Sequence, residues 1–286
     1  LNADGTIGPI GTFTVNVDDR TAPTVTAVRP GYESTRLTLS FSEPIVAFDA
    51  KDVHLEPTIE AKGVEIGRNG RSAVITLASA PKAGTPYTLT LANVRDAPAN
   101  HNVAAPAAHS FTVPSPVFAM DVIEKSAYGT TIKDVAGLPT KGGDAFTINI
   151  FARMDKQPAN HTILAGFGAC GQSVSGQGRY LAKFATGVHF WAHHGDMTGT
   201  EQFDLGRWQM ITATSDGTTM RLYKNAKLIG ERPASLTDDA SVVNIAPLDP
   251  WDKRYQFKGD LAGLTIWNAA LDAESLKALM QSSPQE

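Results

Sequence analysis

The sequence predicts an all-β protein, and three observations support this. Short runs rich in Val, Thr, Ile, Leu and Phe recur along the chain, with 25 Gly and 17 Pro spread between them. Many runs alternate polar and apolar residues, which is the period of a half-buried strand: Leu37, Leu39 and Phe41 alternate with Thr38 and Ser40. Only one segment, near the C-terminus, has a strongly helical pattern. Short strands at short intervals, with turn signals between them, favour a β-sandwich.

Length and composition exclude several classes of protein. A chain of 286 residues is long enough for about two domains, and 42% hydrophobic with 19% charged residues fits a folded protein. A net charge of -4 argues against a nucleic-acid partner. The sequence contains no run of about 18 apolar residues, so we expect no membrane span. The chain starts at Leu1 without a signal segment, so we expect a processed piece of a longer protein. The single Cys170 allows no intrachain disulfide.

The first expected boundary lies at 114–116, Pro-Ser-Pro, because two prolines after a strand lack the backbone N–H groups that a sheet needs. The strand before it ends in Phe-Thr-Val at 111–113, and the same three residues occur at 13–15, before another Pro-containing junction. Tandem modules would make residues 1–18 the last strand of a preceding module. The alternative is two ordinary strands that happen to share three residues.

Residues 19–114 form the first expected module. The segments "DDRTAPTVTAV", "LTLSFSEPI", "AGTPYTLTLANVRDAPANHN" and "HSFTV" follow one another in it. This order resembles the bacterial Ig-like modules that occur in strings on secreted enzymes and surface proteins. The resemblance implies a spacer or docking role. The family commonly has Gly-Asn in the turn where this chain has Ala-Pro-Ala-Asn at 97–100, so we expect a reshaped turn.

The second expected module, 117–286, contains two distinctive segments. "GRWQMITATSDGTTMRLYKNAKLIGE" (206–231) predicts two strands around an Asp-Gly turn at 216–217 and a second turn at 224–227. "GDLAGLTIWNAALDAESLKALM" (259–280) predicts a strand and then a helix capped by Asp272. Leu271 and Leu276 occupy the positions of a hydrophobic staple across the start of this helix.

Together these two segments resemble the concanavalin-A-like (laminin-G-like) jelly roll. The hallmarks of that family are a Gly-x-Trp strand, an Asp-Gly turn, an "lYkNGkl" strand and a final "I-W-n-x-A-L" segment. The resemblance covers about 117–282 and implies two facing curved sheets, one of them concave. Ala226 stands where the family has Gly, so the left-handed turn conformation falls to Asn225 or costs strain. The expected fold is an Ig-like β-sandwich followed by a jelly-roll sandwich with one short C-terminal helix.

Catalysis is not expected from this module. Glucanases on this fold place two Glu on one strand, which keeps the carboxylates on one face about 5–5.5 Å apart. No two Glu residues between 117 and 282 are closer than 30 residues: Glu124, Glu201, Glu231 and Glu274. Two Asp pairs stay open as alternatives, although turn carboxylates are the favoured interpretation: Asp238 with Asp239, and Asp249 with Asp252.

The most informative pattern is "TGVHFWAHH", in which His189, Trp191 and His193 share one face of a strand. The residues between them are apolar and fit the core face: Val188, Phe190 and Ala192. A Trp on the outer face is costly unless it covers something, and an aromatic ring between His residues suits a sugar. The alternatives are that Trp191 packs under a loop, or that His189 and His193 bind a transition metal.

The loop 247–257, "PLDPWDKRYQF", is the second candidate site. Trp251, Arg254 and Tyr255 would border the concave sheet and suit a sugar, especially an acidic one through Arg254. The alternative is that Trp251 plugs the loop and the charges are solvated. By resemblance, one structural Ca²⁺ is expected at a sheet edge, near Asp121 and Asp260.

The expected function is a non-catalytic carbohydrate-binding module with an Ig-like spacer. It would be the C-terminal fragment of a larger secreted or cell-surface bacterial enzyme that acts on polysaccharides. The expected partners are a glycan and the upstream domains of the same chain, and we expect a monomer. Two alternatives stay open: spacer or adhesion modules without glycan binding, which would have a buried Trp191 and no groove, and a catalytic jelly roll with an unfamiliar residue set.

Overall fold

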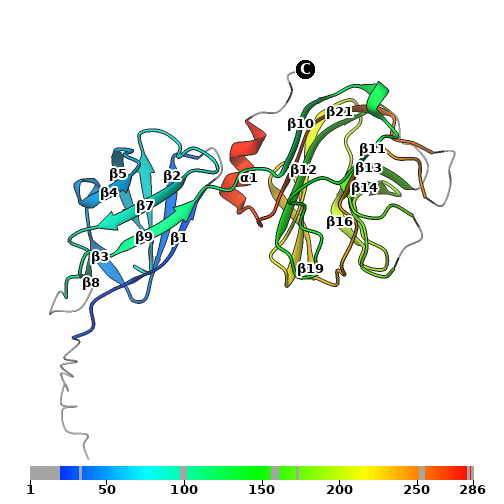
Figure 1. The fold of residues 1–286 in the computed structure, drawn as a ribbon. Coiled ribbons are helices and arrows are strands. Elements are labelled where there is room, and N and C mark those ends of the chain that lie inside the picture. The colour runs from blue at the N-terminus through cyan, green and yellow to red at the C-terminus, as the bar shows by residue number, and fades with distance from the viewer. Residues whose placement is uncertain are drawn as a thin grey trace, which may run out of the picture.

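The computed structural model describes residues 20–31, 34–96, 102–155, 161–171, 174–250, 255–281 and 284. Figure 1 shows two bodies of antiparallel sheet joined by one chain segment, with helix α1 between them. The prediction of an all-β protein with one short C-terminal helix is confirmed. No helix in the described ranges has the length and hydropathy needed to cross a membrane. The predicted strand within 1–18 and the predicted turn at 97–100 lie outside the described residues.

The N-terminal body has a four-stranded sheet, β1-β2-β6-β5, a three-stranded sheet, β4-β7-β9, and a two-stranded ribbon, β3-β8. One core joins the two larger sheets, with Leu39 and Ile75 from the first and Leu89 and Phe111 from the second. The strands and one short 3-10 turn are β1 Val25–Pro30, β2 Arg36–Phe41, β3 Ile45–Ala47, η1 Ala50–Asp52, β4 Val53–Glu56, β5 Ala61–Ile66, β6 Ser72–Leu77, β7 Pro86–Leu91, β8 Arg95–Asp96 and β9 Ala108–Thr112.

The predicted alternation of β2 is confirmed. Leu37, Leu39 and Phe41 are buried, while Thr38 and Ser40 between them are half-buried on the opposite face.

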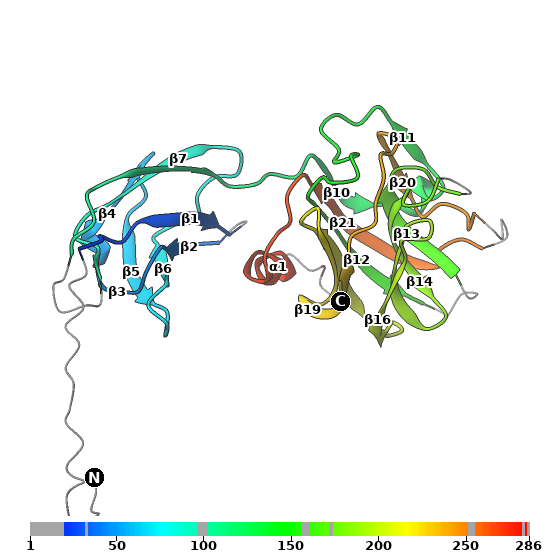
Figure 2. The same cartoon turned by 90° about the horizontal axis from the view of Figure 1, so that it is seen from below.

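The larger body consists of two six-stranded antiparallel sheets. Sheet I has the order β10-β21-β12-β17-β18-β19 and sheet II the order β11-β20-β13-β14-β15-β16. Figures 1 and 2 both place sheet I next to α1 and sheet II on the far side. The strands of sheet I are β10 Phe118–Ile123, β12 Phe146–Met154, β17 Trp208–Ser215, β18 Thr219–Lys224, β19 Lys227–Pro233 and β21 Gly259–Trp267. The strands of sheet II are β11 Thr131–Lys133, β13 His161–Phe167, β14 Arg179–Phe184, β15 Gly187–Trp191, β16 Met197–Gln202 and β20 Val242–Ile245. A second 3-10 turn is η2 Lys125–Ala127.

The central strands of sheet I, β12 and β17, are buried on both faces. Residues Phe146, Ile148 and Ile150 of β12 fill the core between the sheets, while Phe151 lies in a separate cluster on the outer face. Helix α1 (Ala273–Met280) covers this outer face with Leu276 and Leu279.

The predicted helix start is confirmed. The Asp272 side chain accepts a hydrogen bond from the Ser275 backbone N–H, at 2.9 Å. Leu271 and Leu276 are buried in the same cluster, as the staple requires.

The hairpins of sheet I follow the predicted turns. β17 and β18 meet around Asp216-Gly217, with Gly217 at φ +89°. In the β18–β19 turn Asn225 and Ala226 both adopt left-handed backbone, at φ +50° and +58°. Ala226 therefore carries the strain predicted for the missing glycine, about 1–2 kcal/mol.

Candidate functional site

The candidate site lies on the outer face of sheet II, the face turned away from sheet I. Strand pairing places His161 opposite Phe184, and Ala182 opposite His189. Leu181, between Ala182 and Tyr180, points into the core between the sheets. Because side chains alternate along a strand, Tyr180, Ala182 and Phe184 point outward. The predicted core face of β15 is confirmed too, since Val188, Phe190 and Ala192 all lie in the core between the sheets.

Three rings converge on this face. His161 and His189 stand on strands that flank β14, and the small Ala182 between them leaves room for their rings to lie 5.9 Å apart at 78°. The Phe184 ring lies 6.0 Å from His161 and 5.4 Å from His189. The sequence alone groups none of these pairs, because they depend on which strands neighbour one another.

Both imidazoles are held by a second group. His161 Nδ1 lies 2.9 Å from Asp249 Oδ2, and His189 Nδ1 lies 2.9 Å from Thr198 Oγ1. Burial, together with the nearby His161, lowers the pKa of His189 to about 3. His189 is therefore neutral at neutral pH, a state in which one ring nitrogen donates a hydrogen bond and the other accepts one.

Phe184 is the exposed aromatic residue of this face, with 47% of its surface accessible. Sequence reasoning missed it. The signal was available in "YLAKF" (180–184), where Phe184 alternates with the core residue Leu181. A flat ring beside the neutral imidazole of His189 can pack against the apolar face of a ligand.

The burial of Trp191 contradicts the prediction that its ring is exposed. The residue is on the predicted face of β15, but it is only 1% exposed and its ring lies 5.4 Å from that of Tyr180. Gly178 lies against the indole and Cys170 packs against the same cluster, so these two residues cover the ring. His189, at 5% exposure, is likewise buried rather than solvent-facing. The alternative interpretation, that Trp191 packs under a loop, is the correct one.

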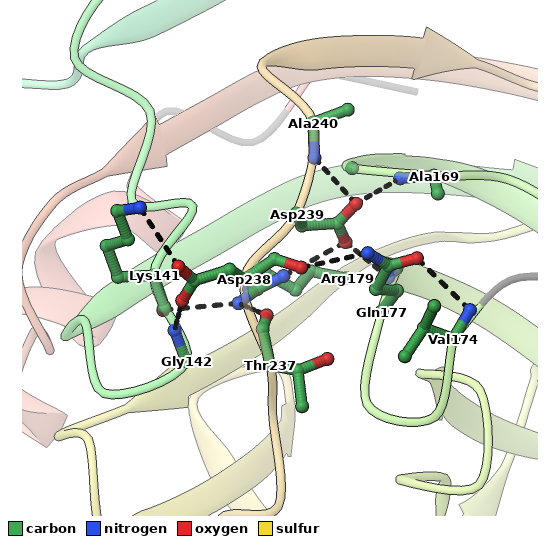
Figure 3. A network of polar contacts seen from close by, with 12 residues as sticks. Lys141, Gly142, Ala169, Val174, Gln177, Arg179, Thr237, Asp238, Asp239 and Ala240 are labelled. Carbon is green, nitrogen blue, oxygen red and sulfur yellow. Dashed lines mark hydrogen bonds and ion pairs between the residues drawn. The ribbon is translucent and has the colours of Figure 1, made fainter.

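A buried ion pair fixes that loop, as Figure 3 shows. The side chains of Arg179 and Asp239 are fully buried, with Arg179 Nη1 3.1 Å from Asp239 Oδ2. The Asp239 carboxylate also accepts backbone N–H groups from Ala169 at 2.7 Å and from Gly178 at 2.5 Å. Burial lowers the pKa of Arg179, and the Asp239 charge opposes this shift. One carboxylate therefore holds both ends of the loop over Trp191.

The neighbouring Asp238 has a different environment. It is exposed and accepts hydrogen bonds from Lys141 Nζ at 2.9 Å and from the Gly142 N–H at 3.0 Å (Figure 3). Asp238 and Asp239 each bind to other chain segments, in keeping with the favoured interpretation as turn carboxylates.

The remaining predicted site residues are only partly placed. His193 is half-buried in the turn after β15, and its ring lies 4.2 Å from that of His194. Tyr255 is 36% exposed, and its carbonyl accepts the Asp249 N–H at 2.8 Å, which ties it to the residue that orients His161. Trp251 and Arg254 lie outside the described residues, so their roles stay predictions.

Of the two residues predicted to bind calcium, Asp260 already pairs with two cationic side chains. Asp260 Oδ2 pairs with Arg153 at 2.7 Å and Oδ1 with Lys125 at 3.3 Å, which does not fit a free calcium ligand. Asp121 is exposed on β10. Within the described ranges, no three His, Cys, Asp or Glu residues gather in a way that could hold a metal ion. The calcium site stays a prediction.

The fold defines the class of the protein: a β-sandwich module followed by a jelly roll, with a candidate site on the outer face of one sheet. Family comparison agrees. Residues 126–277, more than half of the chain, match the concanavalin A-like lectin/glucanases superfamily, and the chain belongs to it. Residues 19–113 match the bacterial Ig-like domain. Both resemblances and their order are therefore confirmed. No curated protein matches this chain.

Solved structures are similar at low identity. The binding domain of botulinum neurotoxin serotype G is 13% identical, with a TM-score of 0.43, over 58% of this chain and 51% of that one. A Bacteroides ovatus protein provisionally named carbohydrate-binding is 14% identical, with a TM-score of 0.43, over 91% and 80%. Domain 4 of AbnA, a GH43 extracellular arabinanase from Geobacillus stearothermophilus, in complex with arabinotriose, is 13% identical, with a TM-score of 0.37, over 78% and 82%. The chain thus spans about half the length of the neurotoxin domain. Similarity at this level carries no information about a ligand.

Proposed function

We propose that the jelly roll is a non-catalytic glycan-binding module and that the Ig-like module is its spacer. The glycan would bind on the outer face of sheet II, at Phe184 with His161 and His189. The parent protein would be a larger secreted or cell-surface bacterial enzyme that acts on polysaccharides. The module would raise that enzyme's effective concentration near its substrate.

Phe184 is the observation that carries this proposal. An aromatic ring with 47% of its surface exposed, bracketed by two imidazoles, has the chemistry that stacks on the C–H face of a sugar. The neutral imidazole of His189 has one donor and one acceptor nitrogen, which suits a ligand with hydroxyl groups rather than charges. Membership of a superfamily of lectins and glucanases supports the same class of ligand.

The glutamates support a non-catalytic role. A retaining glycosidase needs two carboxyl groups about 5–5.5 Å apart, one of which reacts as a nucleophile. In this chain Glu201 pairs with Lys227 at 2.6 Å, Glu231 with Arg221 at 2.7 Å and Glu274 with Arg36 at 2.6 Å. Each of these three carboxylates thus has a cationic partner, while Glu124 accepts a hydrogen bond from Ser126 Oγ at 3.3 Å.

The loop after β20 extends the proposed site. Asp249 and Tyr255 frame this loop, so we propose that Tyr255 contributes to the rim together with Trp251 and Arg254. His193 would lie further along the same face. A structural Ca²⁺ near Asp121 remains part of the proposal and is tested by the same experiment.

Binding of the whole chain to a glycan array and to polysaccharide affinity gels, with and without Ca²⁺, tests this function. We expect retention on at least one plant, algal or microbial polysaccharide, and loss of that retention in Phe184→Ala. Leu228→Ala is the matched control, because Leu228 is exposed to the same extent (47%) but lies on β19 of sheet I. Retention that survives Phe184→Ala would place the site elsewhere, and no retention on any polysaccharide would contradict glycan binding.

A second candidate function is a structural or adhesive spacer on a cell surface. The burial of Trp191 favours it, since this alternative requires a core role for that residue. The absence of any glycan binding in the same screen, with the wild type folded, would make this the better assignment. A catalytic jelly roll is the third candidate and predicts turnover of a polysaccharide by this chain alone.

A further inference from the structure

We propose that the cleft between the two modules is a second binding site and that it takes an uncharged oligosaccharide segment. The inference rests on the proposed glycan-binding function, but it concerns different residues on the opposite side of the jelly roll.

The cleft has the size of a ligand site. Its volume is about 770 Å³, within the range of about 300–1,000 Å³ for small-molecule sites. One wall comes from β1 and β2 of the Ig-like module, and the other from β17, β18 and the start of α1. Figures 1 and 2 both show α1 between the two bodies, where it forms part of this wall.

The jelly-roll wall presents donors and acceptors in fixed positions. Arg221 Nη1 lies 2.9 Å from Asp216 Oδ2, and Arg221 Nε lies 2.7 Å from Glu231 Oε2. Two carboxylates thus fix the orientation of the Arg221 guanidinium, and the Arg221 side chain remains 31% exposed. Beside it Tyr223, another residue of the lining, is largely buried. A sugar diol can donate to the carboxylate and accept from the guanidinium at the same time.

The Ig-like wall offers flexible polar groups. Arg29 and Thr38 are partners across the β1–β2 pair, and both line the cleft. Arg29 is exposed and Thr38 is half-buried. Val28 and Pro30 flank them and add apolar surface. Apolar surface with a few placed polar groups is the usual lining of a small-molecule site.

A direct contact between the modules lies beside the cleft. Arg36 Nε lies 2.6 Å from Glu274 Oε1, which joins β2 to α1. Gly31 lies beside Ser275 at the same junction, and Ser275 also lines the cleft. These contacts join β2 and the end of β1 to α1 at the edge of the cleft.

The charges favour an uncharged ligand. The lining contains two cationic side chains, Arg29 and Arg221, and two carboxylates, Asp216 and Asp272. The cleft therefore has no excess of positive charge to attract a polyanion. A neutral, hydroxyl-rich chain can use the paired charges as hydrogen-bonding groups without an uncompensated charge being buried.

Calorimetric titration of the full chain with neutral oligosaccharides tests this proposal. The probes are cello-, xylo-, manno- and arabino-oligosaccharides of four to six units, with oligogalacturonate as the acidic comparison. Thr38→Trp fills the cleft from the Ig-like wall. Ser40→Trp is the matched control, because Ser40 lies on the same face of β2 but outside the cleft lining. Arg29→Ala is a second variant that removes a side chain without filling the space. Hydrogen exchange of 28–30 and 270–275 reports on the cleft itself.

We expect two sites per chain for a neutral oligosaccharide and protection of 28–30 and 270–275 on binding. Thr38→Trp should remove one site together with the protection. Arg29→Ala should weaken binding at that site at least tenfold. Ser40→Trp should leave both the site and the protection unchanged. Phe184→Ala should remove the other site and leave the protection. A single site that Phe184→Ala abolishes and Thr38→Trp leaves intact would overturn the cleft proposal and leave the proposed function standing. Cleft protection by oligogalacturonate alone would overturn the neutral-ligand assignment. No binding of any neutral probe by the folded wild-type chain would overturn the cleft proposal, whereas the proposed function would be contradicted only if the array and the affinity gels also showed no retention.

Discussion

Gly178 lies against the indole ring of Trp191, so closely that a methyl group at residue 178 would overlap the ring. The glycine has a left-handed backbone, at φ +80°, and donates its N–H to Asp239. Trp191 is therefore buried by a loop whose shape depends on glycine and on one carboxylate. Because of this contact, Trp191 is a buried packing residue on the outer face of sheet II and not the exposed binding residue that the sequence predicted.

Gly178→Ala should destabilise the protein more than Gly206→Ala does. Both glycines have positive φ, at +80° and +69°, so both variants incur the left-handed backbone cost of about 1–2 kcal/mol. Only at Gly178 does the new methyl group meet the Trp191 ring, whereas nothing lies within 4 Å at Gly206. We expect an extra loss of about 1–3 kcal/mol in the free energy of unfolding, measured by urea denaturation. Equal losses would show that the loop moves away from Trp191 without cost.

Trp191→Ala should lower the free energy of unfolding by about 3–5 kcal/mol, since it empties a fully buried site. Phe184→Ala should cost less than about 1 kcal/mol, because that ring is half exposed. Denaturant titration of both variants checks this, alongside glycan retention. A Trp191→Ala protein with wild-type stability but no glycan binding would restore the ligand role that the sequence predicted.

Asp239→Ala should lower the free energy of unfolding by about 3–5 kcal/mol, because Arg179 is left as an uncompensated buried charge. Asp238→Ala is the control: the adjacent carboxylate is 67% exposed and pairs with an exposed Lys141, so its loss should destabilise the protein far less. The double change Arg179→Met with Asp239→Ala should recover only part of the stability, since the N–H groups of Ala169 and Gly178 still lose their acceptor. Full recovery would mean that the loop does not depend on this carboxylate.

His189 should make the protein less stable in acid. Its pKa is about 3 in the folded chain, against an ordinary value of 6.5. Below pH 6.5 the unfolded chain takes up a proton that the folded chain refuses, so the stability present above 6.5 is lost progressively until about pH 3. The slope is about 1.4 kcal/mol per pH unit at most.

His189→Gln isolates this effect, because the acidic groups titrate in both proteins and cancel in the difference. We expect the difference in unfolding free energy between wild type and variant to be constant above pH 6.5 and to fall below it. An imidazole pKa near 6.5, measured by NMR in the folded protein, would contradict the burial that the structure assigns to His189.

Periodicity predicted the all-β class and the direction of side chains correctly, and the two family resemblances predicted the two modules. The alternation in β2, the Asp-Gly hairpin and the cap at Asp272 are all local, so a few neighbouring residues decide them. Alternation also placed Trp191 on the correct face of β15. It could not predict exposure, because that depends on Asp239, which lies 48 residues further along the chain and holds the covering loop.

The candidate site was harder to predict for the same reason. His161, Phe184 and Asp249 come from three separate parts of the chain, and strand order alone brings them together. Phe184 ends a strand for which the sequence analysis made no prediction, so its alternation with Leu181 went unused.

Helix α1 covers the outer face of sheet I and stands between the two modules, so sheet II faces away from the Ig-like module. A polysaccharide surface gripped by sheet II would therefore touch the molecule at its distal tip. The Ig-like module would extend away from that surface. Its length would set the distance between the polysaccharide and residue 20 of the chain.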